Sequence, residues 1–320
     1  TRPPLIYPNS PGPQTRTTLD IIETFTHGGR GDLNHCIPTT APIDLPASDL
    51  SLDPYIIGYW LGDGCKQGGG IASGAQDAEW VIDMLNRAQF ETTHRPKNNM
   101  VWVRGLRLIL RNMGAAPDKI IPQNYLWSSA EQRLAFLQGL MDSDGHAGPS
   151  NVEFCSTRRD HAEAVVFLAR SLGQKPRLSE GRASIYGKDC GPKYRVQWRP
   201  TIPVFRLPRK LEKFDPIGNQ SLRNHHRMIV DYKRIDNTPM RCIQVGSPNS
   251  MFLIGEGMIP PHNTRTGAEW LIEEHQHNGA KNSAIVGATS SDVRKYCING
   301  ASGILRSAPA TFRPICFPSK

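Results

Sequence analysis

Two nine-residue segments of similar pattern occur in this chain, and the duplication constrains the fold more than any other feature of the sequence. The segments are IIGYWLGDG at 56–64 and LQGLMDSDG at 137–145. In each, a small residue recurs after four positions, as Gly58 with Gly62 and as Gly139 with Ser143. Residues spaced by four lie on one face of an α-helix, and small side chains there let two helix backbones approach closely. The spacing predicts two helices that pack through these faces.

The segments after each nonamer follow the same order, so the duplication extends well beyond nine residues. A helix ending in Asp-Gly leads to a short strand, an amphipathic helix and basic strands. In the first copy these are DPYIIGYWLGDG, GGGIAS, AQDAEWVIDMLNRAQF and NNMVWVRG. In the second they are RLAFLQGLMDSDG, NVEFCST, RRDHAEAVVFLARSLG, RASIYG and KYRVQWRP. The period of about 80 residues predicts an internal repeat.

Asp63 and Asp144 are equivalent residues at the ends of the two predicted helices. If the helices pack as expected, two carboxylates meet at the negative ends of two helix dipoles, which is unfavourable unless a cation lies between them. Mg²⁺ prefers oxygen ligands, and two such acids can support the hydrolysis of a phosphodiester. A single Asp-Gly helix end would instead be an ordinary C-cap, but two copies in a repeat favour a metal site.

Both nonamers resemble the LAGLIDADG homing-endonuclease motif, and the order of elements is similar to that family over about residues 53–215. The resemblance implies that Asp63 and Asp144 are the metal-binding catalytic acids and that the two sheets straddle the major groove of DNA. It also implies a lysine near the site. Lys193 is our candidate and Lys97 a second one, with a phosphate contact or plain surface charge as the alternative for each. Further candidate DNA contacts are Arg104, Arg182, Arg195 and Arg199.

The charge of the chain agrees with a nucleic-acid partner. The formal net charge is +9 and the pI is near 9.3. Double-stranded DNA is the expected polyanion, and a solvated basic surface without a ligand is the alternative. The seven cysteines form no CxxC pair, which favours a reducing bacterial cytoplasm. The apolar runs are too short to span a bilayer, so we expect no membrane association.

A His-Asn-Thr tripeptide at residues 262–264 carries a second kind of chemistry. The amide of Asn263 can attack its own carbonyl carbon, which cuts the chain after Asn263. His262 can polarise that carbonyl as a proton donor, and Thr264 offers a hydroxyl nucleophile downstream. The tripeptide alone would usually be a loop. Its sequence context therefore decides between a loop and a site of chain cleavage.

That context, RCIQVGSPNSMFLIGEGMIPPHNT, resembles the C-terminal splicing motifs of inteins. The resemblance implies that Cys242 attacks the upstream splice junction directly, although a buried strand cysteine is the alternative. Pro261 and Ser250 depart from the residues usual in that variant. Residues 1–52 are expected to be a partial N-terminal intein segment and linker, with TTLDIIETF as a short strand or turn. A missing N-terminal intein part would then come from further upstream or from another chain.

Residues 264–320 resemble the ATPase domain of phage terminase large subunits just after the phosphate loop. The resemblance implies an insertion at that loop, with Thr264 as the hydroxyl that coordinates Mg²⁺ after splicing. The Gly and Lys of the loop are absent from this chain, so we expect no normal ATP binding.

The sequence therefore predicts an α+β chain in four parts. A duplicated α-β-β-α endonuclease (53–215) lies between β-rich intein segments (1–52 and 216–263), and an α/β ATPase fragment (264–320) follows. The predicted function is an intein-encoded homing endonuclease that cuts the uninterrupted terminase gene. The alternatives are a degenerate intein that only binds DNA and a terminase ATPase fragment with an inert insertion.

Overall fold

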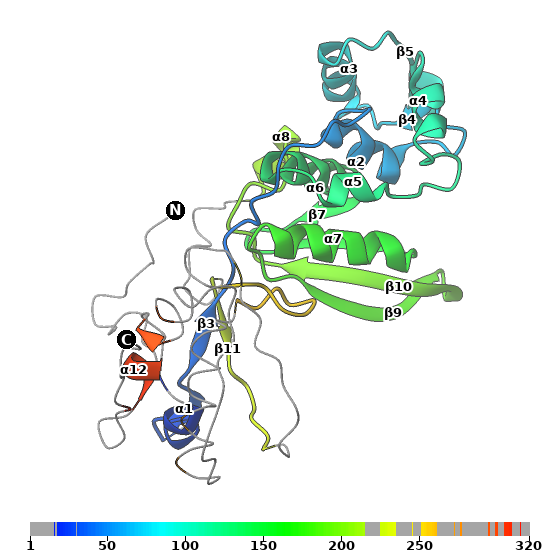
Figure 1. Cartoon of the computed structure of the whole chain (residues 1–320). Coiled ribbons are helices and arrows are strands. Elements are labelled where there is room, and N and C mark those ends of the chain that lie inside the picture. The colour runs from blue at the N-terminus through cyan, green and yellow to red at the C-terminus, as the bar shows by residue number, and fades with distance from the viewer. Residues whose placement is uncertain are drawn as a thin grey trace. The chain divides into compact units, whose positions relative to one another are not determined.

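The structure of the chain is a computed structural model. It describes residues 16, 18–29, 31–214, 225–234, 245, 251–260, 272, 276, 294, 298–299, 304–308 and 314. The chain divides into two compact units, Thr1–Tyr232 and Lys233–Lys320. The first unit holds both predicted repeats (Figure 1).

The first repeat has the predicted order of elements together with a strand and a helix that the pattern did not indicate. It runs through α2 (Pro54–Asp63), β4 (Gly70–Ala72), α3 (Ala78–Arg87), β5 (Thr92–Arg95), β6 (Met100–Val103) and α4 (Leu106–Asn112). A 3-10 turn, Pro96–Asn98, joins β5 to β6. The three strands form an antiparallel sheet in the order β4-β6-β5. The unpredicted elements are β5 and α4.

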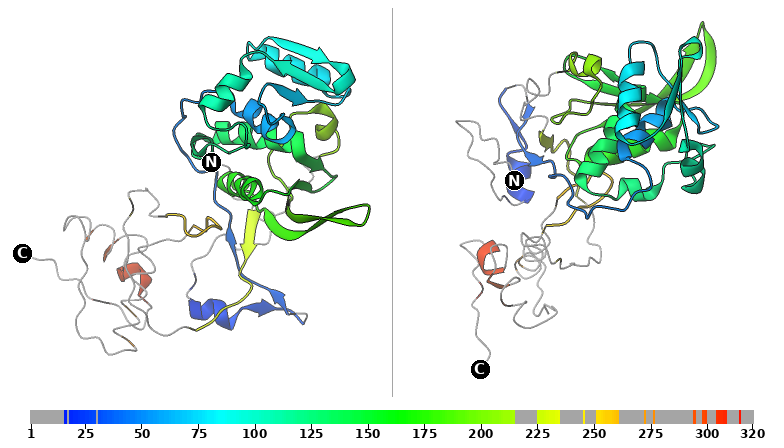
Figure 2. Two further views of the ribbon diagram at one scale, coloured as in Figure 1. Left: turned by 90° about the vertical axis from the view of Figure 1, so that its right-hand side faces the viewer. Right: turned by 90° about the horizontal axis from the view of Figure 1, so that it is seen from above.

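The second repeat is longer and carries a larger sheet. After the short helix α5 (Gln123–Leu126) it runs through α6 (Ala130–Asp144), β7 (Gly145–Ala147), β8 (Val152–Ser156), α7 (Arg159–Ser171), β9 (Arg177–Ile185) and β10 (Lys188–Trp198). The antiparallel sheet has the order β7-β8-β10-β9. Figures 1 and 2 show β9 and β10 projecting as a long hairpin.

The first sheet, β4-β6-β5, matches three strands of the second in order, β8-β10-β9, which supports the predicted duplication. In the second sheet, Gly145 of β7 pairs with Phe154 of β8. In the first, Gly64 forms an isolated antiparallel bridge with Ile71 of β4. Each Asp-Gly helix therefore runs directly into the edge of its own sheet. The first sheet keeps only this single bridge where the second has the strand β7.

The core of the first unit is centred on α2 and α6. Residues 55–61 of α2 are all buried. A helix that is buried all round must lie between other elements rather than on the surface. By contrast α3 and α7 are amphipathic and bury one face each, with Val81 and Leu85 facing inward from α3. The paired helices thus form the middle of the domain, and the outer helices cover the sheets.

The segment before the first repeat differs from its prediction. TTLDIIETF forms the helix α1 (Thr18–Glu23) rather than a strand or turn. Asp20 lies in its first turn, where a carboxylate is favoured by the helix dipole. Strands β1 (Thr26–His27) and β2 (Asp32–Leu33) pair next. Then β3 (Cys36–Pro38) pairs with β11 (His226–Met228), so the chain enters and leaves the repeats side by side.

The second unit is described only in short pieces. Ile254 and Ile259 form an antiparallel bridge within the predicted β-rich segment, and α12 spans Ile304–Ser307. Most of the predicted ATPase fragment, residues 264–320, lies outside the described residues. Among the helices that the structure describes, none has the length and apolarity needed to cross a membrane.

Candidate nuclease site

Local capping signals fix where the two central helices begin. Asp53 caps α2, with its carboxylate accepting from the backbone N–H groups of Tyr55 at 2.8 Å and Ile56 at 3.3 Å. A reciprocal capping box between Ser129 and Gln132 starts α6. Such caps satisfy the free N–H groups of a first helical turn. The helix starts are therefore set by sequence signals that do not depend on the distant repeat.

The glycines after the two aspartates are not ordinary C-caps. Gly64 has φ −71° and Gly145 has φ −86°, so neither adopts the left-handed conformation of a usual helix-ending glycine. A Cβ on Gly64 would lie 2.1 Å from Cδ1 of Trp60, and one on Gly145 would lie 2.4 Å from the carbonyl oxygen of Met141. Glycine is needed here because the extended chain turns back closely over the last helical turn.

The predicted small-residue faces do meet. A Cβ on Gly58 would lie 2.4 Å from the carbonyl oxygen of Phe136, and one on Gly139 would lie 2.2 Å from that of Tyr55. Real Cβ atoms do not approach backbone atoms this closely, so the crossing requires glycine on both helices. One turn later, Gly62 faces side-chain atoms instead: a Cβ there would lie 2.2 Å from Oγ of Ser143 and 3.0 Å from the carboxyl carbon of Asp144.

The crossing brings Asp63 and Asp144 together at the helix ends. Burial, together with the nearby charge of Asp144, raises the pKa of the half-buried Asp63 to about 6. The side chain of Asp144 is exposed, but the protein around it still raises its pKa. Both shifts mean that the ionised pair is unfavourable without a counter-charge. A cation bound here would relieve that strain.

Two lysines face the acidic pair, and each holds a helix end. Nζ of Lys119 donates to the carbonyl oxygen of Gly62 at 2.6 Å. Nζ of Lys210 donates to the carbonyl oxygens of Met141, Asp142 and Gly145 at 2.9, 2.6 and 2.7 Å. Burial lowers the pKa of Lys210 to about 8, against the opposing charges of Asp142 and Asp63. Burial also lowers the pKa of Lys119, and there Asp144 and Asp63 oppose the shift.

Sequence reasoning missed both lysines. Lys119 lies in the link between the repeats, within PDKII, and Lys210 lies in α8 (Pro208–Leu211), within the basic run RLPRKLEKF. The predicted Lys193 lies in β10 opposite Gly181 of β9, and Lys97 lies in the 3-10 turn of the first repeat. Burial raises the pKa of Asp144, and the side chains that oppose this rise are Lys119, His161 and Lys210 rather than Lys193. A direct role for Lys193 stays a prediction.

A buried carboxylate fastens the segment that carries Lys210. Oδ2 of Asp142 accepts from the hydroxyl of Tyr55 at 2.8 Å and from the backbone N–H groups of Arg206 at 2.7 Å and Leu207 at 3.1 Å. Three donors on one oxygen hold residues 206–207 against α6. Further along, Arg209 forms a two-pronged ion pair with Asp77 of the first repeat. The segment after β10 therefore links the two repeats beside the acids.

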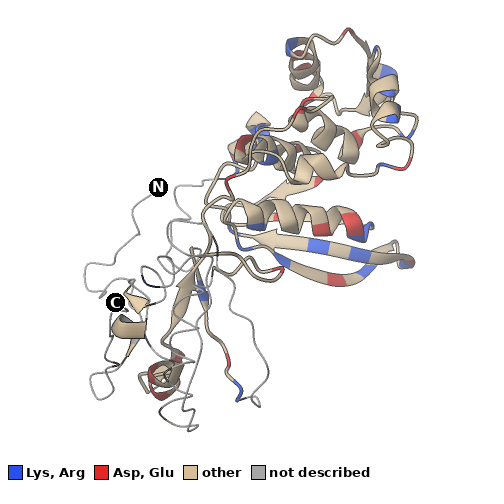
Figure 3. Cartoon of the chain, viewed as in Figure 1, with Lys and Arg blue, Asp and Glu red and all other residues tan. Residues whose placement is uncertain are grey.

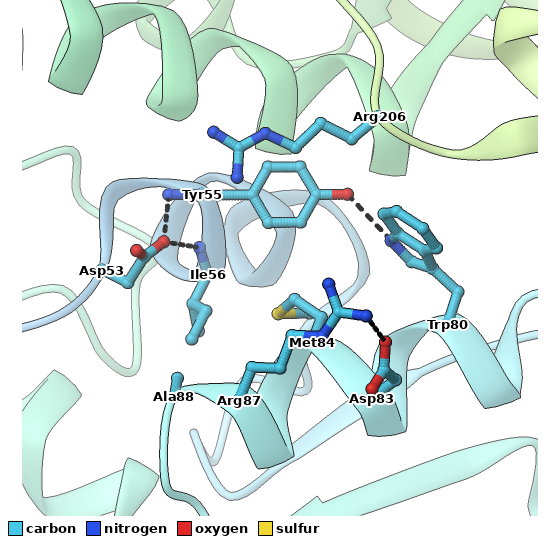
Figure 4. Close-up of a pocket in the computed structure, with 9 residues that line it drawn as sticks. All are labelled: Asp53, Tyr55, Ile56, Trp80, Asp83, Met84, Arg87, Ala88 and Arg206. Atoms are coloured by element: carbon cyan, nitrogen blue, oxygen red, sulfur yellow. Dashed lines mark hydrogen bonds and ion pairs between the residues drawn. The ribbon is translucent and has the colours of Figure 1, made fainter.

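A cavity of about 280 Å³ lies at the opposite end of α2. Figure 4 shows Tyr55 at its centre, with the Arg206 guanidinium over the ring at 4.5 Å and Nε1 of Trp80 donating to the hydroxyl at 3.2 Å. Asp53 lines this cavity, whereas Asp63 ends the same helix. At about 1.5 Å per residue the two ends lie about 15 Å apart. The cavity is therefore separate from the acidic pair.

The acidic pair suits a divalent cation that leaves some of its coordination positions to water or substrate. Among the residues that the structure describes, no three His, Cys, Asp or Glu side chains cluster as a complete metal cage. Mg²⁺ is commonly bound by one or two carboxylates, with water and substrate phosphates as the other ligands. Asp63 and Asp144 supply that number of carboxylates. The donors present thus suit Mg²⁺ with a bound phosphate better than a structural metal.

Basic side chains follow the two long strands of the second repeat, whereas the strands of the first repeat hold only one, Arg95. Figure 3 shows Lys and Arg along β9 and β10. Some of this charge is compensated: Arg182 pairs with Asp189, Arg195 with Glu153 at 2.8 Å, and Arg104 with Glu91 at 2.8 Å. Arg199 is exposed just after β10. The second hairpin is much longer than the first, with nine and eleven residues against four and four.

The predicted splicing residues fall elsewhere. Cys242, His262, Asn263 and Thr264 lie outside the described residues, as do Ser250 and Pro261. Their roles stay predictions.

Known proteins are similar to this chain in two comparisons of sequence. A family model described as LAGLIDADG-like domain matches residues 131–198. A replicative DNA helicase DnaB of Mycobacterium intracellulare is 31% identical over 261 residues, which is 80% of this chain and 43% of that protein. The chain thus spans less than half the length of this relative.

Solved structures of the homing endonuclease I-DmoI are also similar, but remotely. One, in complex with DNA and Ca, is 14% identical with a TM-score of 0.34, and the match covers 49% of this chain and 93% of that one. Another, in complex with DNA and Mn, is 15% identical with a TM-score of 0.32 and covers 46% and 89%. The family match falls on α6 to β10, the elements that carry Asp144 and the long hairpin.

Proposed function

We propose that residues 53–215 form a site-specific endonuclease that makes a metal-dependent double-strand cut in DNA. The main observation behind this proposal is the crossing of α2 and α6 through Gly58 and Gly139, which brings Asp63 and Asp144 close together. The match of residues 131–198 to the LAGLIDADG-like domain supports it. The basic side chains of β9 and β10 supply a surface for the DNA backbone.

Asp63 and Asp144 are the residues that would hold Mg²⁺ between the helix ends and a DNA phosphate. When bound, such an ion lowers the pKa of water and neutralises a leaving oxygen. Because both carboxylates have raised pKa values, they attract the cation strongly. The role of the protein is therefore to keep two unfavourable charges in fixed positions until metal and phosphate arrive.

Lys119 and Lys210 add positive charge beside the same phosphate. Lys119 holds its ammonium group at the Gly62 carbonyl and within the field of both acids. Lys210 has its three protons on three carbonyl oxygens, so it orients the end of α6 rather than binding substrate freely. We assign Lys119 to the developing negative charge of the phosphate and Lys210 to the position of Asp144.

Substitution of the acids tests the assignment. With Mg²⁺, the purified chain should cut a duplex that carries the uninterrupted terminase phosphate-loop sequence. Asp63→Asn and Asp144→Asn should each abolish cutting and leave DNA binding largely intact, because they remove a metal ligand but no basic side chain. Cleavage by either variant at the wild-type rate would exclude the metal-site assignment. Binding without any cleavage by the wild type would favour the alternative, a degenerate DNA-binding protein.

We further propose that the nuclease lies within a self-processing intein. The helicase relative supports an element shared between unlike hosts: the segment from Thr264 holds only 57 residues, so most of the 261 matched residues lie before it. A terminase gene in a bacterial cell, and an inserted position at its phosphate loop, remain proposals drawn from residues 264–320. The third alternative, a terminase fragment with an inert insertion, predicts neither cleavage of DNA nor cleavage of the chain.

Chain cleavage after Asn263 tests the splicing part. Cyclisation needs only the Asn263 amide and a proton donor, so incubation should release a fragment that begins at Thr264. Asn263→Ala should block release, His262→Ala should slow it by about 10²–10⁴-fold, and Cys242→Ala should leave it nearly unchanged. Release that persists in Asn263→Ala, measured by mass spectrometry, would indicate ordinary proteolysis.

A further inference from the structure

Lys119 has an unusual backbone conformation for its residue type. Its φ is +55°, in the left-handed region that glycine adopts readily and a lysine rarely does. Such a conformation costs of the order of 1–3 kcal/mol and persists only where surrounding contacts impose it. The side chain at this position carries the ammonium group that binds the Gly62 carbonyl. Some other part of the fold must therefore hold this backbone.

The contacts that hold it come from the second repeat. Nε2 of His161, in α7, lies 2.8 Å from the carbonyl oxygen of Lys119. A carbonyl oxygen only accepts, so this nitrogen carries the proton and His161 is the donor. Nη1 of Arg158, just before α7, donates to the preceding carbonyl, that of Asp118. Two successive carbonyls of the link are thus bound by one helix start.

Both donors are themselves fixed. His161 is only 3% exposed. Arg158 is held by the carboxylate of Asp160 through Nε at 3.0 Å and through Nη2. A buried ring and a paired guanidinium lose little further freedom when they bind the link. The start of α7 therefore holds the link through one buried donor, His161, and one partly exposed donor that is ion-paired, Arg158.

We infer that His161 and Arg158 are positioning residues: they clamp the carbonyls of residues 118 and 119 so that the ammonium group of Lys119 points at the acidic pair. The inference rests on the proposed nuclease function and deepens it. It makes the lysine beside the first acidic helix depend on α7 of the second repeat. A lysine on an unheld link would reach the phosphate in many orientations, and misplacement by about 1 Å can cost about 10²-fold in rate.

The cleavage test separates this role from simple support of the fold. His161→Leu removes the N–H donor and should lower the single-turnover cleavage rate by about 10–100-fold, with the DNA dissociation constant changed by less than about twofold. His161→Gln places an amide N–H near the lost Nε2 and should recover most of the rate. In a Lys119→Met background, His161→Leu should cause no further loss, because the clamp acts through Lys119.

A matched pair tests the second contact. Arg158→Met should slow cleavage, whereas Arg159→Met should not, since Arg159 pairs with the exposed Glu163 of its own helix and not with the link in the described part of the chain. An equal loss in both would indicate a general effect of charge at this helix start. Losses from His161→Leu and Lys119→Met that multiply would likewise overturn the clamp.

Hydrogen exchange decides the inference without any cleavage. The amide of Ile120 donates to the carbonyl of Ala115 within the link. In His161→Leu this amide should exchange at least about tenfold faster than in the wild type, while amides in the middle of α7 keep their protection. Unchanged exchange at Ile120 refutes the clamp. If the wild-type protein does not cut DNA, only the proposed function is refuted, because the exchange measurement tests the clamp independently of cleavage.

Discussion

The crossing of the two central helices can be tested by one added methyl group. Gly139→Ala places a Cβ 2.2 Å from the carbonyl oxygen of Tyr55, 2.7 Å from the nitrogen of Tyr59 and 3.0 Å from the carbonyl carbon of Gly58. All three are backbone atoms of α2, so no flexible side chain can move aside. The two helices must separate, or one must shift along the other.

The expected loss of stability follows from two opposing effects. Alanine favours a helix interior over glycine by up to about 1 kcal/mol. Overpacking of a close-packed contact typically costs about 1–3 kcal/mol and occasionally more. Because the clash is with backbone on three atoms, we expect the upper part of that range before the helix gain is subtracted. The net free energy of unfolding should fall by about 1–3 kcal/mol, or a few to about ten degrees in Tm.

Urea and thermal unfolding measure this loss, and Gly74→Ala is the control. Gly74 is exposed, and a Cβ there meets nothing within 4 Å, so its variant should lie within about 0.5 kcal/mol of the wild type. Cleavage by Gly139→Ala, assayed well below its Tm, should fall more than its stability suggests because the acids move apart. A Gly139→Ala protein as stable as Gly74→Ala would refute the close crossing.

Three further predictions concern charge and reach. The folded pKa of Asp63, about 6, lies above its ordinary 3.8, so the folded state holds an extra proton between these values. Without divalent metal, its contribution to the free energy of unfolding is full below about pH 4 and falls by up to about 3 kcal/mol as the pH rises to about 6. In Asp63→Asn, urea unfolding across that range should lack this part of the fall. Duplex binding should weaken about 100-fold or more between about 50 and 200 mM salt, as titrations at several salt concentrations will measure, and a flat response would exclude phosphate binding. At about 3.3 Å per residue, strands of nine and eleven residues span about 30–36 Å and strands of four about 13 Å, so a footprint should extend several base pairs further on one side of the cut. A symmetric footprint would contradict unequal sheets.

The sequence predicted what depends on local period and repetition. The spacing of Gly58 and Gly62, repeated in Gly139 and Ser143, places small residues on one helix face whatever surrounds them, and the structure brings these faces together. The strand β5 escaped prediction because TTHR shows no alternation of apolar and polar residues. The helix α4, LRLILRN, has only seven residues and carries Leu108 on its exposed side, which obscures its helical period. The extended φ of Gly64 and Gly145 was also beyond the sequence, since Asp-Gly fits both a left-handed cap and a direct entry into a strand.

The lysines show why the rest of the site could not be predicted. Lys119 and Lys210 have no common spacing from the two acids, because each approaches its helix end along a different path through the fold. Lys119 is held by α7, which lies some forty residues further on, while Lys210 is placed by Asp142 through residues 206–207. A duplicated sequence therefore yields an equivalent pair of acids, but the two lysines beside them come from the link and the end, where the repeats differ. Differences between the two acids in metal affinity should follow from these unequal surroundings rather than from the nonamers themselves.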